Sequence, residues 1–334
     1  MDPDIKHQLD PFQSLYLSAR FPTLTLHIMK KIILFAANGF IGESIIDYTK
    51  TNQKDYQIIA VSRKPIPQLP EGYKQVRWDG KTCGPWTKEL EGADLVINLA
   101  GKSVNCRYTK KNKAEIFASR LDSTRIIGEA IQDCKQKPIC WINIASATIY
   151  EHSLERPNTE ETGLIGKGFS VHVCRAWEKA FFAFRDLPTK QILLRSTIVL
   201  GKNGGVYPVL KKLARLGLGG KMGKGNQLIS WIHIHDFCRA LFFVSESTSS
   251  SSIYNIGSPN PVRNELFQKE LRKSLHIPYF INQTHWMLKT GALLIGTETE
   301  LILKSRYVFP QNFIDQGFLF RFPTIQSCLD DLNH

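Results

Sequence analysis

The chain has 334 residues, of which 43% are hydrophobic and 22% charged, as expected of a globular protein with a full core. No apolar run is long enough to cross a bilayer, so we expect no membrane association. The formal net charge of +13 favours anionic partners. Nucleic-acid binding is disfavoured, because the aromatic residues are not interleaved with the scattered lysines and arginines. We expect a small-molecule substrate instead.

The seven cysteines are odd in number and include no C-x-x-C pair. They indicate free thiols in a reducing compartment, with neither a disulfide framework nor a zinc site. We therefore expect a cytoplasmic protein.

Residues 1–28 look foreign to the rest of the chain. They combine Asp2, Asp4 and Asp10 with Pro11 and Pro22, lack a continuous apolar stretch, and precede Met29, a plausible start. We interpret the segment as an extension that is disordered or not native, and the early aspartates disfavour the alternative, a transit peptide.

From Met29 onward, short apolar runs alternate with amphipathic segments. We predict strands at 32–36, 56–62, 76–78, 94–99 and 139–145, and helices at 42–51 and 110–133. This rhythm gives right-handed crossovers and a doubly wound parallel α/β sheet of the Rossmann type, with ligands at the carboxyl ends of the strands.

The segment KIILFAANGFIG (31–42) reads as a strand, a tight turn and the start of a helix. A dinucleotide-binding turn has Gly-x-x-Gly-x-x-Gly spacing, and here these places hold Ala36, Gly39 and Gly42, so the first glycine is missing. In such a fold the N–H groups at the helix start hold a pyrophosphate. The residues that would bind it are Gly39, Phe40, Ile41 and Gly42. An ordinary turn that binds nothing fits the segment equally well.

The second predicted strand ends in Ser62, Arg63 and Lys64, without an acidic residue. An unphosphorylated ribose usually meets Asp or Glu at this place, whereas a 2′-phosphate needs a cation. If a dinucleotide binds, we expect NADP(H) to be preferred over NAD(H), with Arg63 on the phosphate. The alternative is a solvated surface arginine.

The alternation breaks down after Gly201, where we predict helices at 206–216, 237–244 and 264–275 and strands at 228–233 and 253–256. We expect a mainly NADP(H)-binding Rossmann domain over 29–200. A substrate lobe, interleaved with returning sheet elements, follows over 201–283. We expect a C-terminal helical segment over 284–334, with apolar-faced helices at 286–295 and 298–305, and with 311–319 and 325–332 ending the chain.

An ordered set of motifs covers nearly everything from Met29 to the end. They are NGFIG (38–42), VINLAG (96–101), RYT (107–109), SATIY (146–150), CRAWEKA (174–180), LRSTIVLG (194–201), GNQLISWIHIHD (225–236), YNIGSPNPVRN (254–264) and RYVFPQNFIDQGFLFRFP (306–323). In this set the chain resembles the atypical, epimerase-like members of the extended short-chain dehydrogenase/reductase family. These proteins are often labelled nucleoside-diphosphate-sugar epimerases or cell-division-inhibitor relatives, and they carry a short C-terminal domain of unknown function.

The resemblance implies roles for individual residues. Asn98, Ala100 and Gly101 would line the adenine and ribose side of the cofactor. Ser146 would hydrogen-bond the hydroxyl or carbonyl of the substrate. The implied activity is that of an NADP(H)-dependent epimerase or oxidoreductase acting on a sugar nucleotide or another carbonyl or hydroxyl compound. A homodimer is a possible assembly.

The chain departs from the family at one catalytic motif. Catalytic members carry Tyr-x-x-x-Lys on one helix face, where the ammonium lowers the pKa of the phenol so that it can pass a proton. These two places appear here as Ser170 and Cys174. The remaining proton donors are Tyr150, His172 and Cys174, each of which also fits a structural role. We take Ser146 and Tyr150 as catalytic candidates, with a non-catalytic NADP(H)-binding regulator or scaffold as the alternative.

The sequence His233-Ile234-His235-Asp236 places two imidazoles on one side of a predicted strand. Because no third ligand stands at a recognisable spacing, we predict no metal site. Asp236 fits better as the cap of the helix predicted at 237–244.

Overall fold

A seven-stranded sheet forms the centre of the computed structural model, which describes residues 29–53, 55–284, 286–288 and 305–334. Its strands, in spatial order, are β11 (Ile253–Ile256), β6 (Lys190–Ser196), β5 (Cys140–Ser146), β4 (Leu95–Asn98), β1 (Lys30–Phe35), β2 (Tyr56–Ser62) and β3 (Lys74–Arg77). All neighbouring strands pair in parallel, which confirms the doubly wound Rossmann-type sheet. The strand order reverses between β1 and β4, where such sheets bind ligands.

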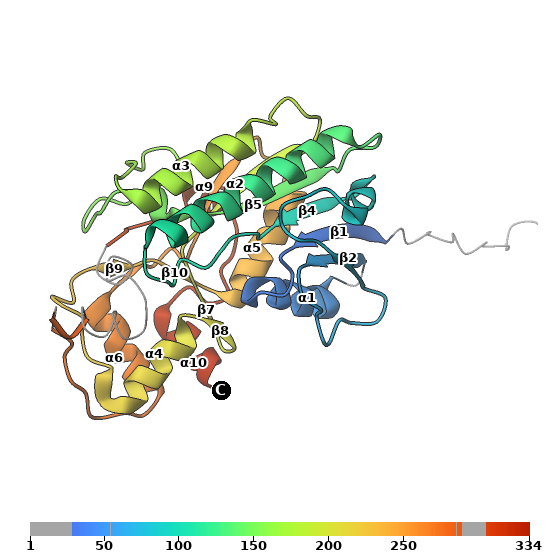
Figure 1. Ribbon diagram of the computed structural model, residues 1–334. Helices are drawn as coiled ribbons and strands as arrows, with labels where there is room; N and C mark the ends of the chain where they lie inside the picture. Colours follow the sequence, from blue (N-terminus) through green and yellow to red (C-terminus); the bar gives the residue numbers. More distant parts are fainter. Residues whose placement is uncertain (1–28, 54, 285, 289–304) are drawn as a thin grey trace, which may run out of the picture.

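Helices cover both faces of the sheet (Figure 1). One face carries α1 (Phe40–Asn52), α5 (Ile234–Glu246) and α9 (Gln311–Asp315), and the other carries η1 (Pro85–Leu90), α2 (Lys110–Asp133) and α3 (Phe169–Phe182). A short turn, η2 (Ala147–Ile149), follows β5. The central strands contain continuous apolar runs because successive side chains enter opposite cores. In β1, Ile32 and Leu34 pack on one side, and Ile33 and Phe35 on the other.

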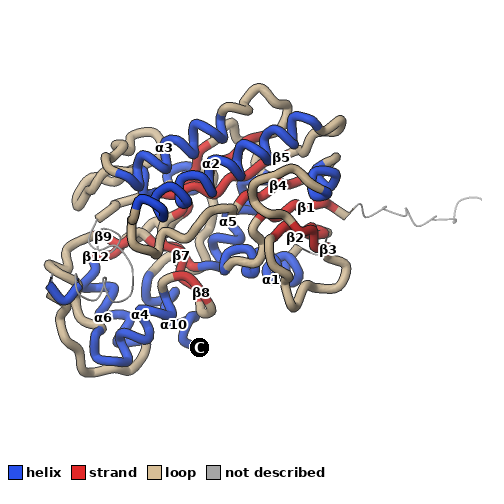
Figure 2. The backbone as a smooth tube through the Cα atoms, viewed as in Figure 1, coloured by secondary structure: helices blue, strands red, loops and turns tan. Residues whose placement is uncertain are grey.

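The smaller lobe extends from the carboxyl edge of the sheet (Figure 2). It contains β7 (Ile198–Gly201), β8 (Gly204–Gly205), α4 (Tyr207–Leu213), η3 (Ala214–Leu218), β9 (Leu228–Ile229), β10 (Trp231–His233), β12 (Val262–Arg263), α6 (Asn264–Ser274) and α10 (Ile325–Asn333). Tyr207, Trp231, Phe267 and Leu329 are fully or almost fully buried in its core. The C-terminal helix therefore closes a core that begins more than a hundred residues earlier in the chain.

The predicted elements agree with the sheet closely and with the lobe less closely. The strand at 56–62 and the helix at 110–133 have the predicted bounds, and the other predicted strands of the first half differ by one or two residues at each end. The strand at 228–233 is split, because Ser230 donates to the Arg306 carbonyl (2.6 Å) and accepts from the Val308 N–H (3.0 Å) of the C-terminal segment. The helices predicted at 286–295 and 298–305 lie outside the described residues except for 286–288 and 305.

Two further expectations concern chemistry and location. The seven cysteines, all within the described residues, are free thiols. In the same part of the chain, no helix has both the length and the apolar character needed to cross a membrane.

Candidate cofactor and active site

The turn between β1 and α1 keeps the shape of a glycine-rich turn although its first glycine is replaced. Ala36 has a φ of +58°, in the left-handed region that favours glycine. Gly39 caps α1, and among the described residues no side chain accepts a hydrogen bond at this helix start. At Gly42, a Cβ atom would lie 2.5 Å from the Ala37 carbonyl oxygen. The helix packs against the turn so closely that only glycine fits there.

Replacing Ala36 by glycine should stabilise the protein by about 1 kcal/mol, because relief of the left-handed strain outweighs the greater freedom of glycine in the unfolded chain. Chemical denaturation measures this change. A loss of stability would show that the Ala36 methyl group makes packing contacts worth more than the strain.

Phe40 and Ile41 point their side chains away from the turn. A Cβ atom at Gly201 or at Gly204 would approach the Phe40 ring to 2.4 Å, so the ring lies directly on the β7–β8 hairpin of the lobe. Ile41 packs against the core beneath α1. These two residues can therefore offer a ligand their backbone N–H groups, while Phe40 fixes the lobe against the helix start.

Three cations surround a hollow of about 500 Å³ at the ends of β2 and β3. Arg63, Lys64 and Arg77 line it with exposed side chains. Gln75 shapes the loop by donating to the Lys64 carbonyl and the Ser62 hydroxyl, both at 2.8 Å. Sequence reasoning missed Arg77, which the parallel register places beside Ser62. The hollow is suited to a phosphate group.

Asn98 does not face the cleft. Its side chain is fully buried and donates to Asn143 Oδ1 (2.7 Å) and Thr124 Oγ1 (3.2 Å), and its oxygen accepts from the Ala100 N–H (2.9 Å). Asn98 thus shapes the turn after β4 from beneath. Of the next residues predicted to line the cofactor, Ala100 is 8% exposed and Gly101 is exposed.

Ser146 ends β5 at the carboxyl edge of the sheet and is partly exposed. Its hydroxyl donates to Thr148 Oγ1 (2.9 Å) and accepts from the Thr148 N–H (3.2 Å). The serine oxygen is therefore held in one orientation, at the edge where ligands bind in parallel sheets.

Tyr150, predicted as a catalytic candidate, is corrected to a structural residue. The side chain is 0% exposed, and burial raises the pKa of its phenol. Its hydroxyl donates to Asn255 Oδ1 and accepts from Arg195 Nη1, both at 2.8 Å. Arg195 in turn makes a two-bonded, buried ion pair with Glu178 (2.9 and 2.8 Å). The hydroxyl is committed to a network that joins α3, β6 and β11.

The other two candidate proton donors, His172 and Cys174, lie in different surroundings. His172 is exposed on α3 and stacks on Phe117, with ring centroids 5.5 Å apart. Cys174 is 4% exposed, and burial raises the pKa of its thiol to about 12. At neutral pH this thiol stays protonated.

The two histidines of the HIHD sequence do not share a strand face. β10 ends at His233, whose Nδ1 accepts from the His235 N–H (3.1 Å) and so caps α5 in place of Asp236. Asp236 is instead buried and accepts from the N–H groups of Arg321 (2.9 Å) and Phe322 (2.8 Å), fixing the C-terminal segment. Within the described residues, no cluster of three metal-ligating side chains occurs.

These features fit an anionic dinucleotide at the β1–α1 turn. The cradle at Gly42 has no room for a Cβ atom, the start of α1 is open to an anion, and the cationic hollow lies along the neighbouring strands. The model of the NAD-dependent epimerase/dehydratase family matches residues 32–257. The chain belongs to this family. Residues 285–332 match the model of a domain of unknown function, DUF1731.

Relatives of this family cover almost the whole chain. An epimerase family protein of Staphylococcus saprophyticus is 30% identical over 92% of this chain and 100% of its own length. The epimerase family protein YfhF of Bacillus subtilis is 28% identical, over 90% and 97%. The crystal structure of the human epimerase family protein SDR39U1 (isoform 2) with NADPH has a TM-score of 0.79 at 25% identity, covering 91% of this chain and 99% of that one.

Proposed function

We propose that this family member binds NADP(H) in preference to NAD(H) and transfers hydride at a carbonyl or carbinol carbon, as an epimerase or oxidoreductase. The observation that carries the preference is the group of three cations, Arg63, Lys64 and Arg77, around the hollow beside the dinucleotide turn. A 2′-phosphate needs cations there, and the strand end offers no acidic partner for a free 2′-hydroxyl. The human relative solved with NADPH supports the same preference.

The chain's own groups would divide the work as follows. The first-turn N–H groups of α1 hold the pyrophosphate, and Arg63 and Arg77 hold the 2′-phosphate. A bound nicotinamide supplies or accepts the hydride. Ser146 would turn its hydroxyl proton from Thr148 Oγ1 to the substrate oxygen and so orient the substrate. A sugar nucleotide is the substrate class we favour, in a reducing compartment such as the cytoplasm, where seven free thiols persist.

A non-catalytic NADP(H)-binding regulator is the second candidate. Ser170 and Cys174 at the places of the family's tyrosine and lysine favour it. Reduction of NADP⁺ by a panel of UDP-sugars, oxidation of NADPH by simple ketones, and analysis of the sugars for epimerised products together separate the two candidates. If the protein is an enzyme, we expect turnover that Ser146→Ala abolishes. Turnover that survives this substitution would show that Ser146 is not a catalytic residue.

Arg63→Ala and Arg77→Ala should each weaken NADPH binding by about tenfold to a hundredfold, because a hydrogen bond between two charged groups contributes about 1.5–3 kcal/mol. NADH binding should change little. Fluorescence titration measures both affinities. Lys50→Ala, an exposed cation in the last turn of α1, removes the same charge far from the turn and is the matched control. Equal losses in all three variants would attribute the effect to net charge and contradict the assignment.

A further inference from the structure

A phenol from another segment lies at the helix position where the family's catalytic tyrosine is missing. Tyr108 precedes α2, and its Oη is 3.5 Å from Oγ of Ser170, the residue at the tyrosine's place in α3. The Tyr108 ring also packs edge-on against Phe169, with centroids 5.2 Å apart and planes at 68°. Tyr108 is partly exposed, whereas Tyr150 is buried. Tyr108 is therefore the more exposed of the two tyrosines.

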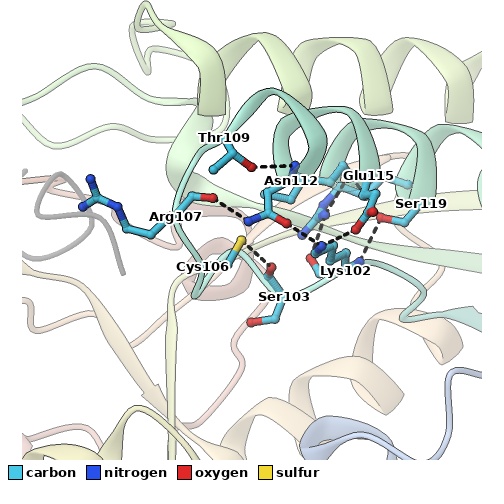
Figure 3. A network of polar contacts seen from close by, with 10 residues as sticks. Lys102, Ser103, Cys106, Arg107, Thr109, Asn112, Glu115 and Ser119 are labelled. Carbon is cyan, nitrogen blue, oxygen red and sulfur yellow. Dashed lines mark hydrogen bonds and ion pairs between the residues drawn. The ribbon is translucent and has the colours of Figure 1, made fainter. Parts of the chain in front are cut away.

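The segment that carries Tyr108 is tied to the start of α2 (Figure 3). Thr109 caps the helix by accepting from the Asn112 N–H (3.2 Å), and Asn112 Nδ2 donates to the Arg107 carbonyl (2.7 Å). Lys102 Nζ donates to Asn112 Oδ1 (2.9 Å). Bonds on both sides of Tyr108 thus hold its backbone against the helix.

A fixed cation lies on α2, the helix that follows this phenol. The Arg120 guanidinium donates to the Lys102 carbonyl (3.0 Å), and its Cζ is 5.2 Å from the centroid of the Trp177 ring. Burial lowers the pKa of Arg120, while the charged forms of Cys174 and Tyr108 raise it. Arginine keeps its charge even so, and by reciprocity a guanidinium that senses a phenolate also stabilises it. The contact with Trp177 places Arg120 against α3, the helix that carries Ser170 and Cys174.

We propose that Tyr108 is the proton-transferring residue of this site and that Arg120 is the positioning cation beside it, the pair replacing the absent tyrosine and lysine from a different segment. This inference rests on the proposed function. When a carbonyl is reduced, its carbon would receive hydride from bound NADPH. Tyr108 Oη gives its proton to the carbonyl oxygen, so the phenol O–H bond breaks as the alcohol O–H bond forms. Ser170 then donates a hydrogen bond to the phenolate until solvent returns a proton.

Nitration by tetranitromethane tests this arrangement on the full chain without a substrate, because the reagent attacks accessible phenolates. Tyr108 should be nitrated at least about threefold faster than Tyr279, which is 60% exposed, since the neighbouring cation increases the reactive phenolate. NADP⁺ should protect Tyr108 and leave Tyr279 unchanged. Peptide mass spectrometry follows both residues, and Tyr108→Phe confirms the modified peptide.

Two substitutions test the cation. Arg120→Met should slow Tyr108 nitration to the rate of Tyr279, and Arg120→Lys, which keeps the charge, should preserve the fast rate. If Arg120→Met does not fold, the comparison of Tyr108 with Tyr279 in the wild-type chain still decides. Tyr108 nitration no faster than that of Tyr279, or no protection by NADP⁺ despite measured binding, would overturn the proposal. If Tyr108 is nitrated fast but the protein does not bind NADPH in titration, this result would instead contradict the proposed function.

Discussion

Gly42→Ala should destabilise the protein by about 2–3 kcal/mol and abolish measurable NADPH binding. The new Cβ would stand 2.5 Å from the Ala37 carbonyl oxygen and 2.7 Å from two further backbone atoms of that residue. No flexible side chain can yield there, so α1 must move away from the turn, and overpacking of this kind typically costs about 1–3 kcal/mol. Chemical denaturation measures the loss, and titration measures binding.

Gly39→Ala is the matched control at the same turn. A Cβ atom at Gly39 would meet only the Ala36 carbonyl oxygen, at 3.6 Å, which is ordinary contact. We expect a loss below about 1 kcal/mol, the typical cost of alanine at a helix cap. If both substitutions cost the same, the close approach at Gly42 would not be the feature that shapes this turn.

Glu178→Gln should destabilise the protein by about 3–5 kcal/mol, the largest effect that we expect from a single side chain. Glu178 and Arg195 are 9% and 6% exposed, and the substitution leaves the guanidinium buried without its counter-charge. Burial alone lowers the pKa of Arg195, and the pairing with Glu178 more than reverses this, so Glu178 compensates the cost of burying the charge. Thermal and chemical denaturation measure the loss.

Glu129→Gln provides the comparison on the surface. Glu129 pairs with Arg125 through two contacts of 2.8 and 3.0 Å, but the side chains are 45% and 57% exposed. Such pairs contribute about 0–1 kcal/mol. Equal losses of stability at the two glutamates would contradict the importance of burial.

Tyr150→Phe should lower the stability of the protein, because a structural role for Tyr150 predicts this loss rather than an isolated loss of turnover.

The central strands of the sheet could be predicted from the sequence because they are buried on both faces and read as short apolar runs. The run at 56–62 has the predicted bounds for this reason. The HIHD segment misled the prediction because Ile234, between two histidines, fits an alternating strand and a helix start equally well. The hydrogen bond from the His235 N–H to His233 Nδ1 favours the helix start. A pattern of hydrophobic residues does not reveal this bond.

The site could be predicted only in its local parts. The turn at Gly39 and the cation Arg63 are visible in consecutive residues. Arg77 becomes part of the same hollow only through the register of β2 with β3. The sequence did not reveal that the Tyr150 hydroxyl is bonded, because its partners Asn255 and Arg195 lie 105 and 45 residues away in the chain. Tyr108 was missed for the same reason, since Ser170 is 62 residues distant.

The central claim is that the diphosphate of NADPH binds at the start of α1 and its 2′-phosphate beside Arg63. Amide hydrogen exchange with and without NADPH tests this directly, because unpaired first-turn N–H groups exchange readily until an anion accepts from them. We predict slower exchange in peptides covering 36–42 and 62–66. A second hollow, of about 440 Å³, lies in the lobe and is lined by Lys221 and Arg272. Protection there, with 36–42 unchanged under saturating NADPH, would contradict the account.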